Sequence, residues 1–252
     1  MNIYPILNNS PIVVALVQMK FKAPLFSLES VLTYDTLLKH EFPVRHNNIQ
    51  VGIDLGKTTI PLGESKVSGT SNAEIGSYVY LSKNQKEKLE ISLDTLTYID
   101  ENPYRDWETF KSKILKKVDI LSPLFESAEL YRISVRFVNR FTFEDFTNPK
   151  KYFNALITSV DGQASYPLHQ YGFRLTMDVP DSDIYTIVNH NVENVSQNKY
   201  IYTFDIDVLD RQNLIFDLDT ISETLENLRN IKNKIFFETI TETTLQLCNC
   251  QK

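Results

Sequence analysis

The sequence predicts an α+β protein whose antiparallel sheet carries its long helices on one face. Predicted strands come in runs, and each run ends in a long amphipathic helix, an order typical of this fold class. The second observation is an internal echo, because residues 131–141 resemble residues 11–21. Alternate positions are mostly apolar in both segments, as in strands with one buried face. We therefore predict a tandem pseudo-repeat in which each half has the order β-α-β-β-β-α.

The echo indicates an internal duplication with a first half at residues 1–126 and a second half at residues 127–252. Residues 123–130 do not form a Pro/Ser/Gly linker of the kind that separates independent domains. With 252 residues and 42% hydrophobic content, the chain can bury one sizeable core. We expect residues 1–252 to fold as a single cooperative unit.

The first half begins with the strand of the echo and continues through a region rich in glycine. The predicted elements are, in order, a strand at 11–21, a helix at 27–39, glycine-rich hairpins or a mobile loop at 52–76, and strands at 78–82 and 89–99. In the last strand, Leu89, Ile91 and Leu93 alternate with polar residues and are expected to point inward.

Asp106 is the predicted N-cap of a middle helix that ends near Pro123. Its apolar stripe follows the helical period and consists of Trp107, Phe110, Ile114, Val118, Leu121 and Phe125. We expect Trp107 to anchor this helix in the core.

The second half repeats the plan. Its predicted elements are a strand at 131–141, a short helix at 150–157, strands at 171–179, 184–192 and 200–209, and a long final helix. A capping box of Thr220 and Glu223 is predicted to open the final helix. Its expected buried stripe consists of Ile221, Leu225, Leu228, Ile231, Ile235 and Ile240.

Composition narrows the classes of function. A net charge of −6 disfavours a general nucleic-acid surface, since such surfaces depend on clustered Lys and Arg. No apolar run is long enough for a transmembrane helix and no signal peptide is evident, so we expect a cytoplasmic protein without a membrane association. Cys248 and Cys250 are expected to be free thiols on a fraying tail.

Catalytic and cofactor motifs are weak. The segment 52–58 has one residue too few for a phosphate-binding loop, and Pro61 blocks the helix that should follow it. Asp178, Asp181 and Asp183 lack the glycine and closing Glu of a calcium loop and indicate an acidic hairpin turn. The sequence predicts no catalytic residues, metal site or cofactor, and leaves open whether the protein is an enzyme, with the balance against it.

The most distinctive polar pattern lies on the strand at 131–141, where Arg132, Arg136 and Arg140 share one side. They have two interpretations: ion pairs with carboxylates on neighbouring strands, or forks for an acidic or phosphate-bearing partner. Asn139 lies on the opposite, apolar side and must find hydrogen-bond partners there. It either ties the backbone at the junction of the halves or binds a ligand.

Several segments together resemble a sporadically distributed prokaryotic protein family of about this length and of unknown function. The resemblance rests on Pro11-Ile12-Val13 with Ala15, Tyr104-Arg-Asp-Trp107-Glu108-Thr-Phe110, Arg136-Phe-Val-Asn139-Arg140, Phe216-Asp-Leu-Asp219 and Phe237-Glu-Thr-Ile-Thr-Glu242. The chain departs from the family pattern at Val14, where an acidic residue is expected. The patchy distribution of the family implies an accessory, antitoxin-like or sensor role in a mobile or defence-related gene cluster.

Three functional hypotheses follow. The first is a cytoplasmic protein that binds another protein through its open sheet face or a long helix, with a homo-oligomer also open. The second is an enzyme or small-ligand receptor with a pocket between sheet and helices. The residues proposed for that pocket are Tyr104, Trp107, Asn139 and Arg140. The third is nucleic-acid binding through the arginine-lined strand, which the net charge disfavours.

Overall fold

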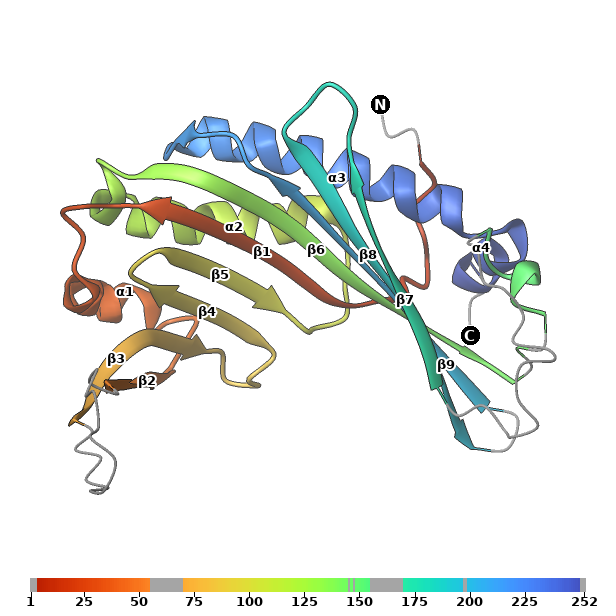
Figure 1. The fold of residues 1–252 in the computed structure, drawn as a ribbon, viewed down its shortest axis with the longest axis horizontal. Helices are drawn as coiled ribbons and strands as arrows, with labels where there is room; N and C mark the ends of the chain where they lie inside the picture. Colours follow the sequence, from red (N-terminus) through yellow and green to blue (C-terminus); the bar gives the residue numbers. More distant parts are fainter. Residues whose placement is uncertain are drawn as a thin grey trace, which may run out of the picture.

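The computed structural model describes residues 4–54, 70–144, 146, 148–154, 170–196 and 199–249. In this part of the chain, ten strands form one antiparallel sheet in the order β2-β3-β4-β5-β1-β6-β9-β8-β7, and β10 pairs with β6 (Figure 1). The strands are β1 (Ile12–Lys22), β2 (Val44–Asp54), β3 (Thr70–Leu81), β4 (Glu87–Ser92), β5 (Thr95–Asp100), β6 (Glu129–Phe143), β7 (Gln170–Asp178), β8 (Ile184–Ser196), β9 (Lys199–Asp210) and β10 (Leu214–Ile215). The predicted α+β class is confirmed.

Two long helices cover one face of this sheet (Figure 1). The helical elements are the 3-10 helices η1 (Leu28–Tyr34), η2 (Ser122–Phe125) and η3 (Pro149–Lys151), and the α-helices α1 (Asp35–Leu38), α2 (Trp107–Leu121), α3 (Leu218–Thr239) and α4 (Glu242–Asn249). Phe110 of α2 packs on Phe137 of β6, with ring centroids 5.7 Å apart. Phe236 of α3 lies 6.0 Å from Phe204 of β9. Since Phe137 and Phe204 occupy the same sheet face, both helices contribute to one core.

The two echo strands, β1 and β6, are direct neighbours at the centre of the sheet. Val17 is paired with Val135, and Met19 with Ile133, so their apolar faces coincide. Outward from this junction, the sheet continues through β5, β4, β3 and β2 on the side of β1, and through β9, β8 and β7 on the side of β6. On both sides, the strands follow in the reverse of their order along the chain. This arrangement agrees with the tandem pseudo-repeat. Duplication and cooperative folding of residues 1–252 stay predictions.

The strand predicted at 89–99 is wrong, because the structure contains two strands, β4 and β5, joined by a tight turn. The Asp94 carboxylate accepts hydrogen bonds from the hydroxyls of Ser92 at 3.0 Å and Thr95 at 2.8 Å. Such local side-chain bonds favour a turn over a continuous strand. Leu93, expected to point inward, is therefore 58% exposed. The first half consequently has one strand more than predicted.

The short helices also differ from expectation. The helix predicted at 27–39 is a 3-10 helix followed by the single turn α1, and the one at 150–157 is the 3-10 turn η3, with residues 155–157 outside the described part. In the glycine-rich segment, residues 55–69 lie outside the described residues, and so does most of the rejected phosphate loop. The acidic segment is a hairpin turn between β7 and β8, as predicted, with Asp181 in the left-handed region at a φ of 56°.

Both long helices begin at an aspartate. The Asp106 cap of α2 is confirmed, since its carboxylate accepts a hydrogen bond from the Thr109 backbone N–H at 2.7 Å. The cap of α3 is Asp217, which accepts from the Thr220 N–H at 2.9 Å, so the predicted Thr220/Glu223 capping box is wrong. Helix α2 ends at Leu121, close to the predicted end.

The C-terminal tail is more ordered than expected up to its last helix. Cys248 is only 2% exposed, and burial raises the pKa of its thiol to about 11. Its backbone carbonyl accepts a hydrogen bond from the Asn9 N–H at 2.7 Å. The fraying tail predicted for Cys248 is therefore wrong, and Cys250 lies outside the described residues. Helix α4 instead holds the N-terminal segment against the rest of the molecule.

Candidate functional site

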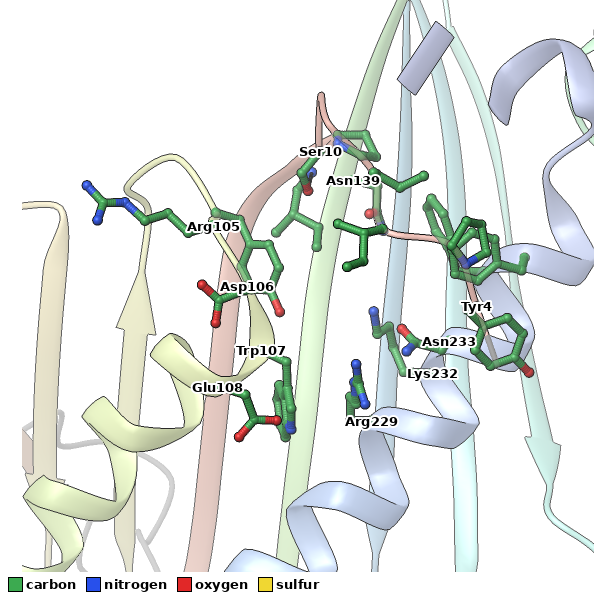
Figure 2. A pocket seen from close by; sticks show the side chains of 18 residues that line it. Tyr4, Ser10, Arg105, Asp106, Trp107, Glu108, Asn139, Arg229, Lys232 and Asn233 are labelled. Atoms are coloured by element: carbon green, nitrogen blue, oxygen red, sulfur yellow. Dashed lines mark hydrogen bonds between the residues drawn. The ribbon is translucent and has the colours of Figure 1, made fainter. Parts of the chain in front are cut away.

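A cavity of about 400 Å³ lies between the N-terminal segment, the start of α2, strand β6 and the middle of α3 (Figure 2). The N-terminal segment closes one side with apolar residues, among them Ile6, Leu7 and Ile12. Its position is fixed by a stack of Tyr4 on Phe237, with ring centroids 4.9 Å apart, and by the bond of Asn9 to α4. A volume of this size is typical of pockets for small molecules.

Lys232 of α3 places a cation in the wall of this cavity. The residue is 7% exposed, and Nζ lies 4.4 Å from the centroid of the Phe137 ring and 6.0 Å from that of Phe236. Among the residues that the structure describes, no carboxylate and no hydrogen-bond acceptor reaches Nζ. Burial, reinforced by the charge of Arg229, lowers the pKa of Lys232 to about 7. The cavity therefore contains an amine whose charge lacks a described counter-ion.

The position of Lys232 follows from the phase of α3. The buried positions of this helix are Ile221, Leu225, Leu228, Lys232 and Phe236. Spacings of three and four residues place all of them on one face. Lys232 thus occupies a core position, one turn from Leu228 and one turn from Phe236. The predicted buried stripe is therefore wrong at two positions, where it has Ile231 and Ile235 instead of the next residues, Lys232 and Phe236. Ile231 and Ile235 are only partly buried against the core.

Arg229 and Trp107 join the two long helices beside the cavity. The guanidinium carbon of Arg229 lies 5.8 Å from the Trp107 ring centroid. The Trp107 indole N–H donates to the Glu226 carboxylate at 2.7 Å, and Lys111 forms an ion pair with the same carboxylate. Burial raises the pKa of Glu226, but the bonds from Lys111 and Trp107 outweigh it and leave this pKa lowered. Glu226 also forms an ion pair with Arg229 at 3.8 Å, so this carboxylate joins α2 to Arg229 on its own helix.

Uncharged polar side chains also line the cavity, namely Ser10, Tyr104, Asn139 and Asn233. The Asn139 amide nitrogen donates to the Phe204 carbonyl at 2.9 Å, which leaves the amide oxygen as the polar atom it can offer to a ligand. This bond ties β6 to β9 within the second half, whereas the first interpretation placed the tie at the junction of the halves. Tyr104 is half-buried against Phe137, and burial raises the pKa of its hydroxyl well above the usual range, so Tyr104 is a neutral donor.

The remaining charges at the rim point away from the cavity centre. Figure 2 shows the side chains of Lys232 and Arg229 rising from α3 toward the space beneath Asn139, whereas Arg105 and Glu108 extend outward. Asp106 is committed to the cap of α2, and the Glu108 side chain is 76% exposed. Because Arg229 is paired with Glu226, Lys232 is the positive charge of the inner wall for which the described residues supply no carboxylate.

Of the four residues predicted for a pocket, the structure brings together Tyr104, Trp107 and Asn139. Arg140 is exposed on the opposite face of β6, because neighbouring residues of a strand point to opposite sides. The predictions missed Lys232, Arg229 and the segment 4–12. The sequence does contain a signal for Lys232, because this lysine is four residues from both Leu228 and Phe236 and so falls on the buried face of α3. The predicted stripe passes through Ile231 and Ile235 instead and therefore misses it.

The three arginines of β6 lie together on the open face but differ in their partners. Arg136 forms two parallel hydrogen bonds to the Asp205 carboxylate, at 2.9 and 2.7 Å, and Asn189 donates to the same group at 3.1 Å. Arg132 hydrogen-bonds the Gln18 side-chain oxygen. Arg136 thus fits the ion-pair interpretation. Within the described residues, no hydrogen bond or ion pair engages the Arg140 side chain, which is exposed.

Asp207 lies beside this cluster. Burial raises the pKa of its carboxyl to about 6 although Arg136 opposes the shift. Its Oδ1 and the Nε of Arg132 are buried and have no hydrogen-bond partner among the described atoms. Unsatisfied polar atoms of this kind are uncommon in proteins.

No family model, curated protein or solved structure matches this chain, which agrees with the resemblance to a family of unknown function. Within the described residues, no group of His, Cys, Asp and Glu could hold a metal ion. In the same part of the chain, no helix is both long and apolar enough to cross a membrane.

Proposed function

We propose that this protein binds a small acidic organic molecule in the cavity between the N-terminal segment, α2 and α3. The observation that carries the proposal is Lys232, a buried amine that faces the cavity without a described counter-charge. A buried ammonium is costly unless an anion accompanies it. A ligand carboxylate or phosphate supplies that anion, so its binding is favoured by a charge for which the described residues provide no counter-ion.

The other walls suit the rest of such a ligand. Apolar side chains of the segment 4–12 and the rings of Trp107 and Phe236 offer apolar contact. Asn139 and Tyr104 provide one acceptor and one donor at the sheet side. A mostly apolar pocket with a few fixed polar groups is typical of small-molecule sites. This favours the receptor or enzyme hypothesis over the protein-partner hypothesis for this face.

The test compares acids as stabilising ligands of the wild type, Lys232→Met and Lys88→Met. Acetate, benzoate, succinate and inorganic phosphate serve as probes in thermal unfolding and calorimetric titration. Lys88 of β4 is the matched control, because it forms an ion pair with Glu101 and does not line the cavity. We expect at least one acid to raise the unfolding temperature of the wild type and of Lys88→Met, since ligands that bind the native state stabilise it.

Lys232→Met should remain folded and lose this response. Equal stabilisation of all three proteins, or no response of the wild type to any of the four acids, would contradict the proposal.

The open sheet face supports a second candidate function, the binding of an acidic protein partner in the cytoplasm. The specific observation is the pair of unsatisfied buried atoms, Arg132 Nε and Asp207 Oδ1, next to the exposed Arg140. The double variant Arg132→Gln/Arg140→Gln retains the pair of Arg136 with Asp205, so the sheet should stay folded. In affinity purification from the native host, loss of a specific protein would support this function. Unchanged recovery would remove the face from consideration, and recovery of nucleic acid would favour the third hypothesis.

A further inference from the structure

A lysine amine is a nucleophile only in its neutral form, and the environment of Lys232 favours that form. Two features act together: Nζ is withdrawn from water against Phe137 and Phe236, and Arg229 adds a second positive charge nearby. Both features activate lysines that attack carbonyl carbons. Relative to an ordinary lysine at neutral pH, the lowered pKa increases the neutral fraction by about 10³-fold.

We infer that Lys232 Nζ forms a reversible imine with the carbonyl of a ligand that also carries a carboxylate, a 2-oxo acid being the chemical class that fits. The inference rests on the proposed function, because it concerns the same cavity. Arg229 and Lys232 are three residues apart on one face of α3, a spacing that places their side chains next to each other. Arg229 keeps its 3.8 Å pair with Glu226, and a ligand carboxylate that lies against the adjacent Arg229 and Lys232 side chains brings its neighbouring carbonyl carbon toward Nζ.

The reaction balances without an oxidant, a reductant or a metal. The nitrogen lone pair of the neutral amine forms a bond to the carbonyl carbon, while the carbonyl π electrons move to oxygen. Transfer of the amine protons to that oxygen gives a carbinolamine and then releases one water molecule as the C=N bond forms. Protonation of the imine restores a cation at Nζ, and the ligand's own carboxylate balances that charge.

Lys117 provides an internal reference. It is also buried on a long helix and lies over aromatic rings, but its ammonium is paired with the Glu41 carboxylate and it does not line the cavity. A chemistry that follows burial alone would modify both lysines. A chemistry that needs the cavity would modify Lys232 only.

The experiment treats the intact protein with pyruvate and sodium borohydride, which reduces an imine to a stable secondary amine. Peptide mapping by mass spectrometry then locates the adduct, whose added mass equals pyruvic acid less one oxygen. We expect one dominant adduct on Lys232 and no enrichment on Lys117. The yield should rise through neutral pH, as the amine loses its proton. Lys232→Arg, which keeps the positive charge but forms no such imine, should lose the adduct.

A parallel calorimetric titration with lactate, which has a hydroxyl in place of the carbonyl, separates the two proposals. If pyruvate and lactate both bind the wild type and no adduct forms on Lys232, the imine is wrong and the acid-binding function stands. If neither acid binds and no adduct forms, the imine is wrong, and the response to acetate, benzoate, succinate and phosphate decides the acid-binding function. Labelling spread evenly over the surface lysines also overturns the imine, since it would show no selection by the cavity.

Discussion

Helices α2 and α3 each place one lysine in the core, and the two lysines differ in how their charge is compensated. Lys117 of α2 is 2% exposed, and Glu41, which follows α1, pairs with it and with Lys116. Burial opposes ionisation of Glu41, but the bonds from the two lysines outweigh this and lower its pKa. Lys232 of α3 is 7% exposed, its Nζ lies over the Phe137 ring near the charge of Arg229, and no carboxylate of the described residues pairs with it.

The difference distinguishes a structural charge from a candidate binding group. At Lys117 the protein supplies the counter-charge itself, so the ammonium, the Tyr98 ring and Glu41 form a closed cluster. Lys232 instead faces the cavity, and no carboxylate of the described residues pairs with it. An unbalanced charge beside a cavity is a typical feature of binding and catalytic sites.

The largest expected effect concerns the residue that links the two helices. Trp107→Ala should lower the free energy of unfolding by about 3–5 kcal/mol, because it removes a ring that is 4% exposed. Trp107→Phe keeps most of the apolar contact and loses the N–H bond to Glu226, at a cost of about 1 kcal/mol. Urea denaturation measures both values. Equal losses in the two variants would mean that packing of the indole is not what holds α2 on α3.

Replacement of each buried lysine by methionine should change the stability of the protein in opposite directions. Lys117→Met should destabilise the protein by about 1–3 kcal/mol, since it removes a partner of the half-buried Glu41. Lys232→Met should stabilise it by about 1–3 kcal/mol at neutral pH, because it removes an uncompensated buried amine. Denaturant titration of both variants gives the signs. A loss of stability in Lys232→Met would indicate a counter-charge and would erase the difference between the helices.

Stability should also depend on pH through Lys232. Its folded pKa is about 7 against an ordinary value of 10.5, so between these values the unfolded chain binds more protons than the folded one. Stability of the wild type relative to Lys232→Met should therefore rise with pH in this window, by at most about 1.4 kcal/mol per unit. The penalty is complete below the window and absent above it. A difference between the two proteins that stays constant from about pH 7 to about pH 9 would contradict the assignment.

The sequence predicts well where local pattern and packing agree. Strand β6 and the Asp106 cap of α2 are examples, since alternation and a capping side chain depend on near neighbours. Sequence pattern predicts poorly where tertiary contacts decide which of two neighbouring residues of a helix faces the core. Ile231 and Lys232 differ by one position, and only the packing of α3 on β6 and β9 decides which is buried. The wall formed by residues 4–12 depends on the contact of Asn9 with α4, which sequence spacing does not encode.

The smallest expected effects concern the open face. Arg136→Gln should cost about 1–3 kcal/mol, because it leaves the Asp205 carboxylate, which is 6% exposed, with Asn189 as its remaining side-chain partner. Arg140→Gln should change stability by less than about 0.5 kcal/mol, as expected for an exposed side chain. Thermal unfolding of both single variants measures the contrast. Similar costs at both positions would mean that the three arginines act as one network.

Titration of the Lys232 side chain by NMR decides whether this residue is a buried amine without a counter-charge that an acidic ligand completes. Protein labelled with ¹³C at lysine Cε, with Lys232→Arg to assign the signal, reports the protonation of each amine. We predict one lysine with a midpoint near pH 7, and a midpoint that rises when the acid that stabilises the wild type is added, because the bound anion favours the charged amine. A Lys232 midpoint near that of the surface lysines, or one that none of the four acids raises, would contradict this assignment.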